Sequence, residues 1–432
     1  MRGRHVRVLP ALAAMMLVAV ACGNASSSPK AKQKATSTTT ASSGVNNSVT
    51  QPGVTSDTIR VGGVASVKNA LNAPYGDIFK GVKAYFAKVN REGGIYGRQL
   101  KLVSERDDGM VNNLKETQGL LTEDNVFASA GNATIFDFSG ASELEKAGIP
   151  SFGWNINTDW NKPNLFGNSG AICIGCVGVE LPWIAKQLGK KSIGVLTYGS
   201  VDNSKKCGEG IKKSFEQYPT AKVGFYSDGH SFGDVDFSVD VRQMKAANVD
   251  FVVTCFDTNA VLAIAKEARA QGLNATQYLP NGYDQAFMKA NGEFFQGAIV
   301  RVPFVPFETK PVPPGLSEYL AEMKRQGATP NEYTTYGWIN GVMLLEGLKG
   351  AGPDFTRKKV VDALNTLTKD TAGGLLEGID WTTQHTDSEP PVGCAAYVKV
   401  VNGKFVPAFV PKGKPFICFK RNAGVGQKPT FR

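Results

Sequence analysis

The protein has 432 residues, of which 42% are hydrophobic and 20% are charged. This length allows two or three domains, and the composition is ordinary for a globular protein. Six of the positive charges behind the formal net charge of +10 lie within the first 34 residues, so +4 remains for the rest. With no dense basic face, the charge does not favour a nucleic-acid-binding protein.

The first residues have the features of an export signal. Three arginines precede an apolar run, Val8 to Ala21, which is shorter than the roughly 20 residues that span a membrane. The run ends in Ala19-Val20-Ala21-Cys22, which resembles a bacterial lipobox and implies cleavage before Cys22 and attachment of lipid, including palmitate, to it. The alternative is an ordinary secretory signal followed by an incidental cysteine.

A flexible tether is predicted after the signal. Residues 24–51 are rich in Ser, Thr and Ala, contain no acidic residue, and have too little apolar surface to fold. We therefore expect a lipoprotein signal peptide at 1–21, and the lipidated Cys22 with its tether at 22–56. Two or three acyl chains would hold the protein stably on the extracytoplasmic face of the cell membrane.

The sequence from Ile59 to Gly109 predicts a strand, a helix and a second strand. Ile59 to Ala65 is short and apolar, as in a buried strand, and Leu100 to Glu105 returns as another. Between them, apolar residues recur at helical spacing: Phe79, Val82, Phe86 and Val89. Ligands of such parallel units lie beyond the carboxyl ends of the strands. The loop from Ser66 to Asp77 is therefore the predicted first wall of a binding cleft.

The same stretch resembles a known family. The motif YGD after the first loop, the turn N-x-x-GG-I-x-G and the acidic pair Asp107-Asp108 are similar to the opening of the type I solute-binding proteins of the leucine/isoleucine/valine-binding family. Members of that family are receptors for ABC importers, and the resemblance extends from about Thr58 to about Gly350. It implies an α/β fold with two doubly wound, Rossmann-like lobes, whose parallel central sheets are joined by a multi-strand hinge.

A candidate oxygen-binding turn follows the third predicted strand. Val126 to Ala130 is expected to end in the small-residue turn Gly131 to Thr134, with a helix beginning there. A helix N-terminus offers free backbone N–H groups and a positive dipole end, which suit a carboxylate. The resembled family holds the ligand's carboxylate at this place, which implies Asn132, Ala133 and Thr134 as ligand contacts. The alternative is simple capping of the helix by Asn132 or Thr134.

Trp154 and Asn155 follow the fourth predicted strand, Ile149 to Gly153, where the family places further ligand contacts. Trp154 would stack on a ligand there, or else pack as a core aromatic. The stretch from Asp159 to Gly170 is predicted to be a loop leading to the second lobe.

A second alternation of strands and helices begins at Lys191 and predicts a second lobe built like the first. Its strands are expected at Ser192–Thr197, Ala221–Ser227, Asp250–Cys255, Thr276–Leu279 and Gly297–Val302. Its helices are expected at Ser204–Tyr218, around Val241 and at Val261–Gln271. The strand ends and the loops after them would place four residues on the second wall of the cleft: Tyr198, Asp257, Asn281 and Tyr283.

A run of prolines between positions 303 and 314 then excludes a continuous helix and predicts a crossing back to the first lobe. Three helices follow, at about Gly315–Gln326, Asn331–Lys349 and Thr356–Leu367. The tail contains an Asn402-Gly403 hairpin turn and is expected to pack on the second lobe. We therefore expect lobe I to comprise residues 57–172 and 304–384, and lobe II residues 173–303 and 385–432.

Six cysteines remain after Cys22, and an even number in an exported chain favours disulfides. Among the possible pairings we favour Cys173–Cys176, Cys207–Cys255 and Cys394–Cys418, the last as a clamp on the C-terminal hairpin. The CxxC spacing of the first pair also occurs in redox dithiols, but these open a helix, whereas this one lies in the expected hinge. Because no second CxxC exists, a zinc site is not indicated.

The ligand class is narrowed by one departure from the family. Branched-chain amino-acid receptors have an acidic residue on the last loop of lobe II that meets the ligand's ammonium, and Asn281 takes its place here. Unless Asp257 or Asp284 substitutes, a buried ammonium would lack a carboxylate, which is costly. A free amino acid is thus in doubt, and an amide, a urea-like compound, a carboxylate without an amine or an aromatic acid remain. Aromatic residues favour a flat or apolar ligand part: Tyr75, Trp154, Tyr198, Phe256 and Tyr283.

No catalytic constellation stands out, since the chain has three histidines and no phosphate-loop pattern. We expect no enzyme, no cofactor, no metal and no nucleic-acid partner. The expected function is that of a monomeric, lipid-anchored receptor that captures a small polar ligand (an amino acid, amide or related carboxylate) between its lobes and delivers it to ABC permease subunits. The alternatives are a ligand sensor of the same fold coupled to a signalling partner, and an extracellular redox enzyme using Cys173 and Cys176.

Overall fold

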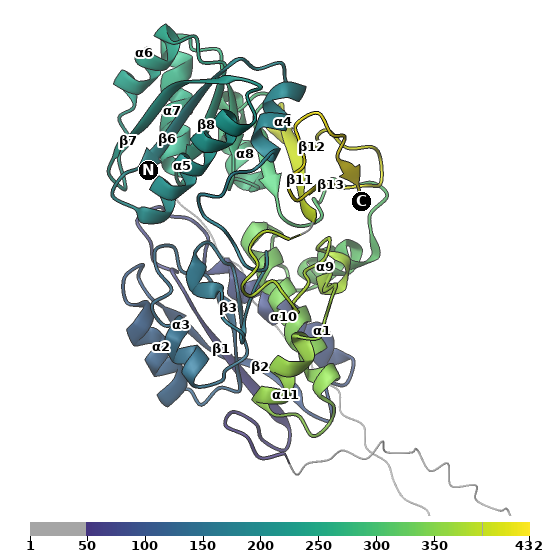
Figure 1. Ribbon diagram of the computed structural model, residues 1–432. Coiled ribbons are helices and arrows are strands. Elements are labelled where there is room, and N and C mark those ends of the chain that lie inside the picture. Colours follow the sequence, from purple (N-terminus) through teal and green to yellow (C-terminus); the bar gives the residue numbers. More distant parts are fainter. Residues whose placement is uncertain (1–48, 391) are drawn as a thin grey trace, which may run out of the picture. The chain divides into compact units, whose positions relative to one another are not determined.

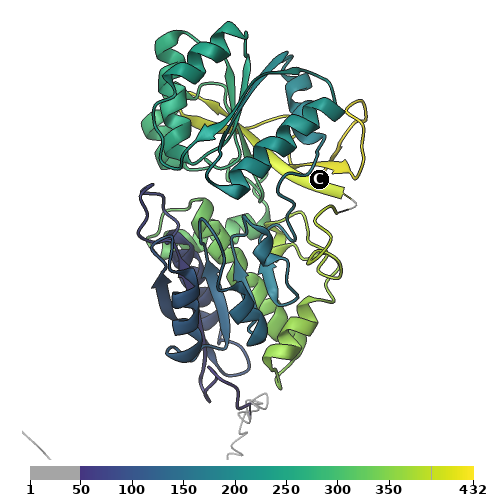
Figure 2. The ribbon, with the colours of Figure 1, turned by 60° about the vertical axis from the view of Figure 1, so that its left-hand side comes forward.

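The computed structural model describes residues 49–390 and 392–432. In this part the chain forms two β-sheets that are covered by helices (Figures 1 and 2). The expected signal peptide, Cys22 and most of the expected tether lie outside the described residues. Among the residues described, no helix combines the length and the apolar character that a bilayer crossing requires.

The first sheet is entirely parallel, with the strand order β2-β1-β3-β4-β5. Its strands are β1 (Thr58–Ala65), β2 (Gln99–Asp107), β3 (Ala128–Asn132), β4 (Ser151–Gly153) and β5 (Leu165–Gly167). The expected loop from Asp159 to Gly170 is wrong, because this stretch contains β5. Since all strands run the same way, the loops after β1, β4 and β5 emerge at one edge.

Helices from two distant parts of the chain cover this sheet. The earlier part supplies α1 (Asp77–Arg91), α2 (Asn113–Thr122), α3 (Ala141–Lys146) and the 3-10 helix η1 (Thr158–Trp160). The later part supplies α9 (Pro314–Arg325), α10 (Glu332–Ala351), α11 (Arg357–Leu364) and η3 (Ala372–Gly374). Figure 1 shows the green α10 beside the purple α1, and α10 also contacts β3 and β4.

Two glycines allow α1 and α10 to touch through their backbones. A Cβ atom at Gly81 of α1 would lie 2.0 Å from the carbonyl oxygen of Thr334, and one at Gly337 of α10 would lie 1.8 Å from that of Ile78. Neither position has room for a methyl group. The apolar stripe predicted on α1 is buried in the same core: Phe79, Val82, Phe86 and Val89.

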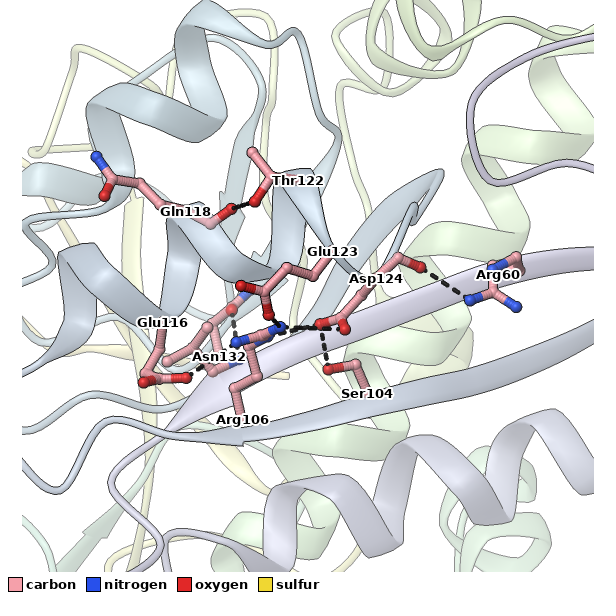
Figure 3. Close-up of polar contacts among 10 residues, drawn as sticks. Arg60, Ser104, Arg106, Glu116, Gln118, Thr122, Glu123, Asp124 and Asn132 are labelled. Carbon is pink, nitrogen blue, oxygen red and sulfur yellow. Dashed lines mark hydrogen bonds and ion pairs between the residues drawn. The ribbon is translucent and has the colours of Figure 1, made fainter.

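A cluster of charges fastens α2 to β2 (Figure 3). The guanidinium of Arg106 pairs with Asp124 and Glu123 at 2.6 Å each and with Glu116 at 3.1 Å. Ser104 donates a further hydrogen bond of 2.6 Å to Asp124. Burial alone would raise the pKa of Asp124, but the hydrogen bonds from Arg106 and Ser104 outweigh it and lower the pKa. This carboxylate therefore remains charged in the fold at neutral pH.

The second sheet has a parallel centre and an antiparallel extension, in the order β14-β13-β11-β10-β9-β8-β6-β7, with β12 paired to β11. The parallel strands are β6 (Ser192–Tyr198), β7 (Lys222–His230), β8 (Phe251–Cys255), β9 (Thr276–Leu279) and β10 (Ile299–Val302). The antiparallel strands are β11 (Val392–Val401), β12 (Lys404–Pro407), β13 (Phe416–Lys420) and β14 (Thr430–Phe431). Figure 2 shows the yellow C-terminal strands continuing the teal ones, so the tail joins the second sheet.

The helices of the second sheet are α4 (Glu180–Gln187), α5 (Asp202–Gln217), α6 (Ser238–Ala246), α7 (Thr258–Gln271), α8 (Gln285–Asn291) and η2 (Gly292–Phe294). The described chain passes between the two sheets along residues 168–179, 303–313 and 375–390. The prediction of an α/β fold with two parallel-centred sheets is confirmed.

Disulfides join Cys173 to Cys176, Cys207 to Cys255 and Cys394 to Cys418, the same pairs that the sequence favoured. The expected clamp on the C-terminal hairpin is wrong. Cys394 on β11 lies opposite Cys418 on β13, whereas the Asn402-Gly403 turn connects β11 to β12. The three cross-links therefore all involve the second sheet or the segment leading into it.

Candidate functional site

A cavity of about 1220 Å³ lies at the strand ends of both sheets. Its lining includes the segments after β1, β4 and β5 and those at the ends of β6, β8, β9 and β10. It continues along α4, α5, the crossing segment 375–390 and the C-terminal strands β11 and β13. This volume exceeds the roughly 300–1,000 Å³ of common ligand pockets. Six of the predicted ligand contacts line it: Tyr75, Trp154, Asn155, Tyr198, Asp257 and Asn281. Four do not: Asn132, Ala133, Thr134 and Tyr283.

The rims of the two walls touch each other. The side-chain amide of Asn259, on α7, donates a hydrogen bond of 3.0 Å to the carbonyl oxygen of Leu71, in the loop after β1. The rings of Phe136 and Phe232 meet edge to face with their centroids 4.8 Å apart. These contacts bridge the first-sheet and second-sheet sides at the cavity's edge.

An aromatic cluster forms the first wall. The rings of Tyr75 and Trp154 stack with a centroid distance of 5.5 Å, and Tyr333 meets both edge to face at 5.0 and 5.3 Å. Tyr75 directly precedes the N-cap of α1, Trp154 follows β4, and Tyr333 lies in the first turn of α10. Trp154 and Tyr75 also line the cavity, so the part of this cluster that remains accessible gives the first wall an apolar, aromatic character.

The opposite wall carries Tyr198 and Asp257. The Tyr198 hydroxyl donates a short hydrogen bond to one carboxylate oxygen of Asp257. The other oxygen accepts hydrogen bonds from the backbone N–H groups of Asn259 and Ala260 and so caps α7. Burial, and then the neighbouring Asp257, raise the pKa of Tyr198, which therefore stays a neutral donor. Both Asp257 oxygens are engaged within the protein.

Of the two ligand contacts predicted in the loop after β9, one lies at the cavity and the other does not. Asn281 is exposed and lines the cavity, whereas Tyr283 is fully buried. The Tyr283 hydroxyl donates to Glu308 and accepts from the backbone N–H of Phe307, at 2.6 Å each. Asp284 caps α8 through the backbone N–H groups of the following residues. The loop thus directs Asn281, and not Tyr283, toward the cavity.

The predicted oxygen-binding turn at residues 131–134 is not at a helix start. Strand β3 continues through Asn132, and the next helix, α3, begins only at Ala141. The Asn132 side chain accepts from the backbone N–H of Val64 at 3.1 Å and donates to the carbonyl oxygen of Phe152 at 2.9 Å. The Thr134 hydroxyl donates to a backbone carbonyl three residues on. These polar groups connect neighbouring strands and the loop instead of facing the cavity.

Asn155 lines the cavity but also holds the first crossing segment. Its amide nitrogen donates to the carbonyl oxygen of Gly170 at 2.6 Å, and its oxygen accepts from the backbone N–H of Ser169. The Cys173–Cys176 disulfide lies in the same segment and also lines the cavity. As paired sulfurs, these two cysteines act as a cross-link and not as free thiols.

A buried carboxylate that the sequence analysis missed joins the two sides. Glu332, at the first position of α10, is 5% exposed and accepts a hydrogen bond of 2.7 Å from Tyr336. The backbone N–H groups of Gly282 and Tyr283, from the loop after β9, also donate to it. Burial is the main reason why the pKa of Glu332 rises to about 7. A glutamate in the first turn of the helix predicted at Asn331–Lys349 is favoured by the helix dipole alone, so nothing in the sequence signals this role.

The ion pair between Arg301 and Glu180, which lines the cavity, was also not predicted from the sequence. The guanidinium of Arg301, on β10, lies 3.3 Å from a carboxylate oxygen of Glu180 at the start of α4. Tyr278 donates a hydrogen bond of 3.4 Å to the same oxygen, and Tyr397 lies opposite Arg301 on β11. Burial would lower the pKa of Arg301, but the charge of Glu180 more than reverses this, so the arginine stays charged. The sequence did contain one sign of this site, because Arg301 is the single charged residue within the apolar segment Gly297–Val302.

Comparisons with known proteins agree with this geometry. A family model described as periplasmic binding protein matches residues 58–404. The Leu/Ile/Val-binding protein of Escherichia coli (strain K12) is 25% identical over 290 residues, which are 64% of this chain and 77% of that protein.

Solved structures show the same fold at lower identity. A solute-binding protein of an ABC transporter from R. palustris, in complex with benzoate, is 18% identical with a TM-score of 0.64 and covers 81% of this chain and 95% of its own. A fatty acid ABC transporter substrate-binding protein from Thermomonospora curvata is 18% identical with a TM-score of 0.67 and covers 87% and 97%.

Proposed function

Because the chain belongs to the periplasmic binding protein family, we propose that it captures a small polar solute in the cavity between its two sheets and delivers it to an ABC importer. The observation that carries the proposal is the cavity itself, whose walls come from the strand ends of both sheets. Closure of two α/β lobes around a ligand is a known mechanical type. We take the lobes as residues 57–172 with 304–384 and 173–303 with 385–432.

Six of the residues proposed from the sequence support a role in ligand contact by their position in the lining: Tyr75, Trp154, Asn155, Tyr198, Asp257 and Asn281. Among them, the stacked rings of Tyr75 and Trp154 contribute apolar atoms to the lining, while Asn281 offers an exposed amide. Asp257 has both oxygens engaged, so it is a poor acceptor for a ligand's ammonium. This arrangement favours an amide or a carboxylate over a free amino acid.

The test is a ligand screen on the purified protein without its signal peptide. Thermal unfolding is measured with leucine, isoleucine, valine, their amides, and aromatic and aliphatic carboxylates, because a ligand that binds only the folded state raises Tm. Isothermal titration then gives Kd for each solute that raises Tm. We expect Trp154→Ala to weaken binding about tenfold or more, while the exposed Lys358→Ala on α11 leaves Kd unchanged. A screen in which no small solute binds would refute the proposed function.

We also propose that Cys22 anchors the protein by lipid on the extracytoplasmic face. The support is the sequence before Cys22 and the Ser/Thr/Ala-rich sequence without acidic residues after it. Metabolic labelling with a palmitate analogue in a bacterial host tests this. Label on the native protein and none on Cys22→Ala would support the anchor, whereas an unlabelled native protein in the soluble extracellular fraction would exclude it.

A further inference from the structure

Arg301 places a positively charged side chain in the lining of the cavity. Its side chain is 34% exposed although it lies on a central strand, because the exposed part faces the cavity that it lines. Val300 and Val302, which flank it, are fully buried in the core. The strand therefore directs one charged side chain toward the cavity between two apolar ones.

The pairing of Arg301 leaves hydrogen-bond donors unused. Its Nε atom lies 3.3 Å from Glu180 Oε1, and this is the ion pair that the guanidinium makes among the described residues. A guanidinium carries five N–H donors in a planar fork that matches a carboxylate with two parallel hydrogen bonds. The Nη groups are thus available for a second oxygen pair.

Three acidic groups are engaged, in contrast to Arg301: Asp257 and Glu180, which line the cavity, and Glu332, which pairs with the lining residue Tyr336. Asp257 caps α7 and accepts from Tyr198. Glu332 accepts from Tyr336 and from two backbone N–H groups. Glu180 accepts from Tyr278 as well as pairing with Arg301. Among these three a ligand's ammonium would find no uncommitted carboxylate, whereas a ligand's carboxylate would find the unused donors of Arg301. The other acidic residues of the lining, Glu377, Asp380 and Glu389, lie in the crossing segment 375–390.

The aromatic wall and Arg301 are connected by Tyr336. The Tyr336 ring lies over Trp154 with a centroid distance of 6.4 Å, and its hydroxyl accepts the indole N–H of Trp154. The charge of Arg301 in turn acts on the Tyr336 hydroxyl. All three side chains line the one cavity, so an apolar surface and a cationic group are both open to a single ligand.

We propose that the ligand is an apolar or aromatic carboxylate without an α-ammonium group, and that its carboxylate pairs with the Nη groups of Arg301 while its apolar part lies against Tyr75 and Trp154. This inference rests on the proposed function and names the class of solute that the site takes. Glu180 then acts as a positioning residue, which holds the Nε edge of Arg301 and turns the Nη edge toward the cavity.

Isothermal titration of the native protein with matched acid and amide pairs tests the inference: benzoate against benzamide, and hexanoate against hexanamide. A hydrogen bond to a charged group contributes about 1.5–3 kcal/mol, which corresponds to roughly 10- to 150-fold in Kd. We expect at least one acid to bind about tenfold or more tightly than its amide. An acid-to-amide ratio near one in both pairs would overturn the inference.

Variants separate ligand binding from a purely structural ion pair. We expect Arg301→Gln to weaken acid binding about tenfold or more with little change for the amide, and Arg301→Lys to restore part of the loss without the bidentate geometry. Glu180→Gln leaves the charge of Arg301 in place, so it should keep the preference for the acid. If Arg301→Gln and Glu180→Gln lower Tm alike and both keep the acid-to-amide ratio of the native protein, the pair is structural and the inference is wrong.

The same titrations distinguish this inference from the proposed function. Tight binding of leucine or of a neutral amide, unaffected by Arg301→Gln, would refute the inference and support the proposed function. Arg269→Gln is the matched control, because Arg269 pairs with Glu293 at an exposed position away from the cavity. This control should leave both Kd values unchanged.

Discussion

The side chain of Glu332 forms hydrogen bonds with groups from both sides of the cavity. It belongs to α10, which packs on the first sheet, yet it accepts hydrogen bonds from the loop after β9 of the second sheet. The sequence could not reveal this role, because a glutamate in the first turn of a helix is common for reasons of the helix dipole alone. The contact depends on where the loop from another sheet arrives, and no local pattern encodes that.

We predict that Glu332 makes the fold less stable as the pH rises through the range from about 4.5 to 7. Its pKa is about 7 in the fold and near 4.5 in the unfolded chain, so between these values the folded state binds more protons and stability falls with rising pH. Urea unfolding of the native protein and of Glu332→Gln at pH 5 and pH 8 measures this. The native protein should lose roughly 2 kcal/mol relative to the variant over that interval.

A control variant, Glu293→Gln, removes an exposed carboxylate that pairs with Arg269 on the surface. Its unfolding free energy relative to the native protein should not depend on pH over this range. The prediction for Glu332 fails if the difference between Glu332→Gln and the native protein is the same at pH 5 and pH 8.

At the scale of elements, long periodic segments were predictable, whereas some short elements, such as β5, were not. The stripe from Phe79 to Val89 has regular helical spacing and became α1. Strand β5 has three residues, too few for a pattern, and α4 contains Pro182 and Trp183, which obscure a helical stripe. The start of α3 was misplaced because the sequence after Ala130 offers cap residues, although the strand continues through Asn132 and the intervening loop reaches Gly140.

Local sequence patterns also predicted the candidate site only in part. Residues at the ends of predicted strands, such as Trp154 and Tyr198, could be placed at a cleft because the carboxyl edge of a parallel sheet follows from topology. Which of them face the cavity depends on hydrogen bonds that cross the chain, such as that between Tyr283 and Glu308. Those partners are distant in sequence or follow no periodic rule, and so the residues alone could not separate Asn281 from Tyr283.

The contact between α1 and α10 gives a prediction about packing. Gly337→Ala should destabilise the fold by about 2 kcal/mol or more, because its methyl group would lie 1.8 Å from the carbonyl oxygen of Ile78 and would force the helices apart. Chemical unfolding measures the change. Gly229→Ala on β7 is the control, since a Cβ there has no heavy atom within 4 Å. Equal stability of the two variants would mean that the helices can separate at little cost.

The Arg106 cluster gives a prediction for the outer edge of the first sheet. Arg106→Met leaves three carboxylates close together without their shared cation, so we expect a loss of about 2 kcal/mol in unfolding free energy. Lys358→Met breaks an exposed pair with Asp362 within α11 and should cost less than about 0.5 kcal/mol. A loss for Arg106→Met as small as that for Lys358→Met would show that solvent compensates for the missing guanidinium.

At the scale of the whole molecule, the disulfides are distributed unequally. Each has at least one cysteine on the second sheet, on its helices or in the segment that enters it, and the strands of the first sheet have none. A cross-link that closes a loop of about 50 residues stabilises by roughly 2–4 kcal/mol. The two halves of the chain should therefore respond differently to a reducing agent.

We predict that reduction loosens the second sheet first. Limited proteolysis with and without dithiothreitol, read by mass spectrometry, should show new early cuts within residues 180–303 and 392–432 only in the reduced protein. Cys207→Ala with Cys255→Ala should reproduce part of this pattern without reductant. Early cuts that fall mainly within residues 58–167 would contradict the prediction.

The late position of α10 in the chain has a consequence for how the protein is made. A ribosome completes all five strands of the first sheet long before it produces the helix that fits against the Gly81 side of α1. Until then the nascent chain carries an uncovered apolar face, which makes it prone to aggregation and a target for chaperones. Truncated translation products that stop before Glu332 should thus be cleared by cellular proteases, however complete their strands are.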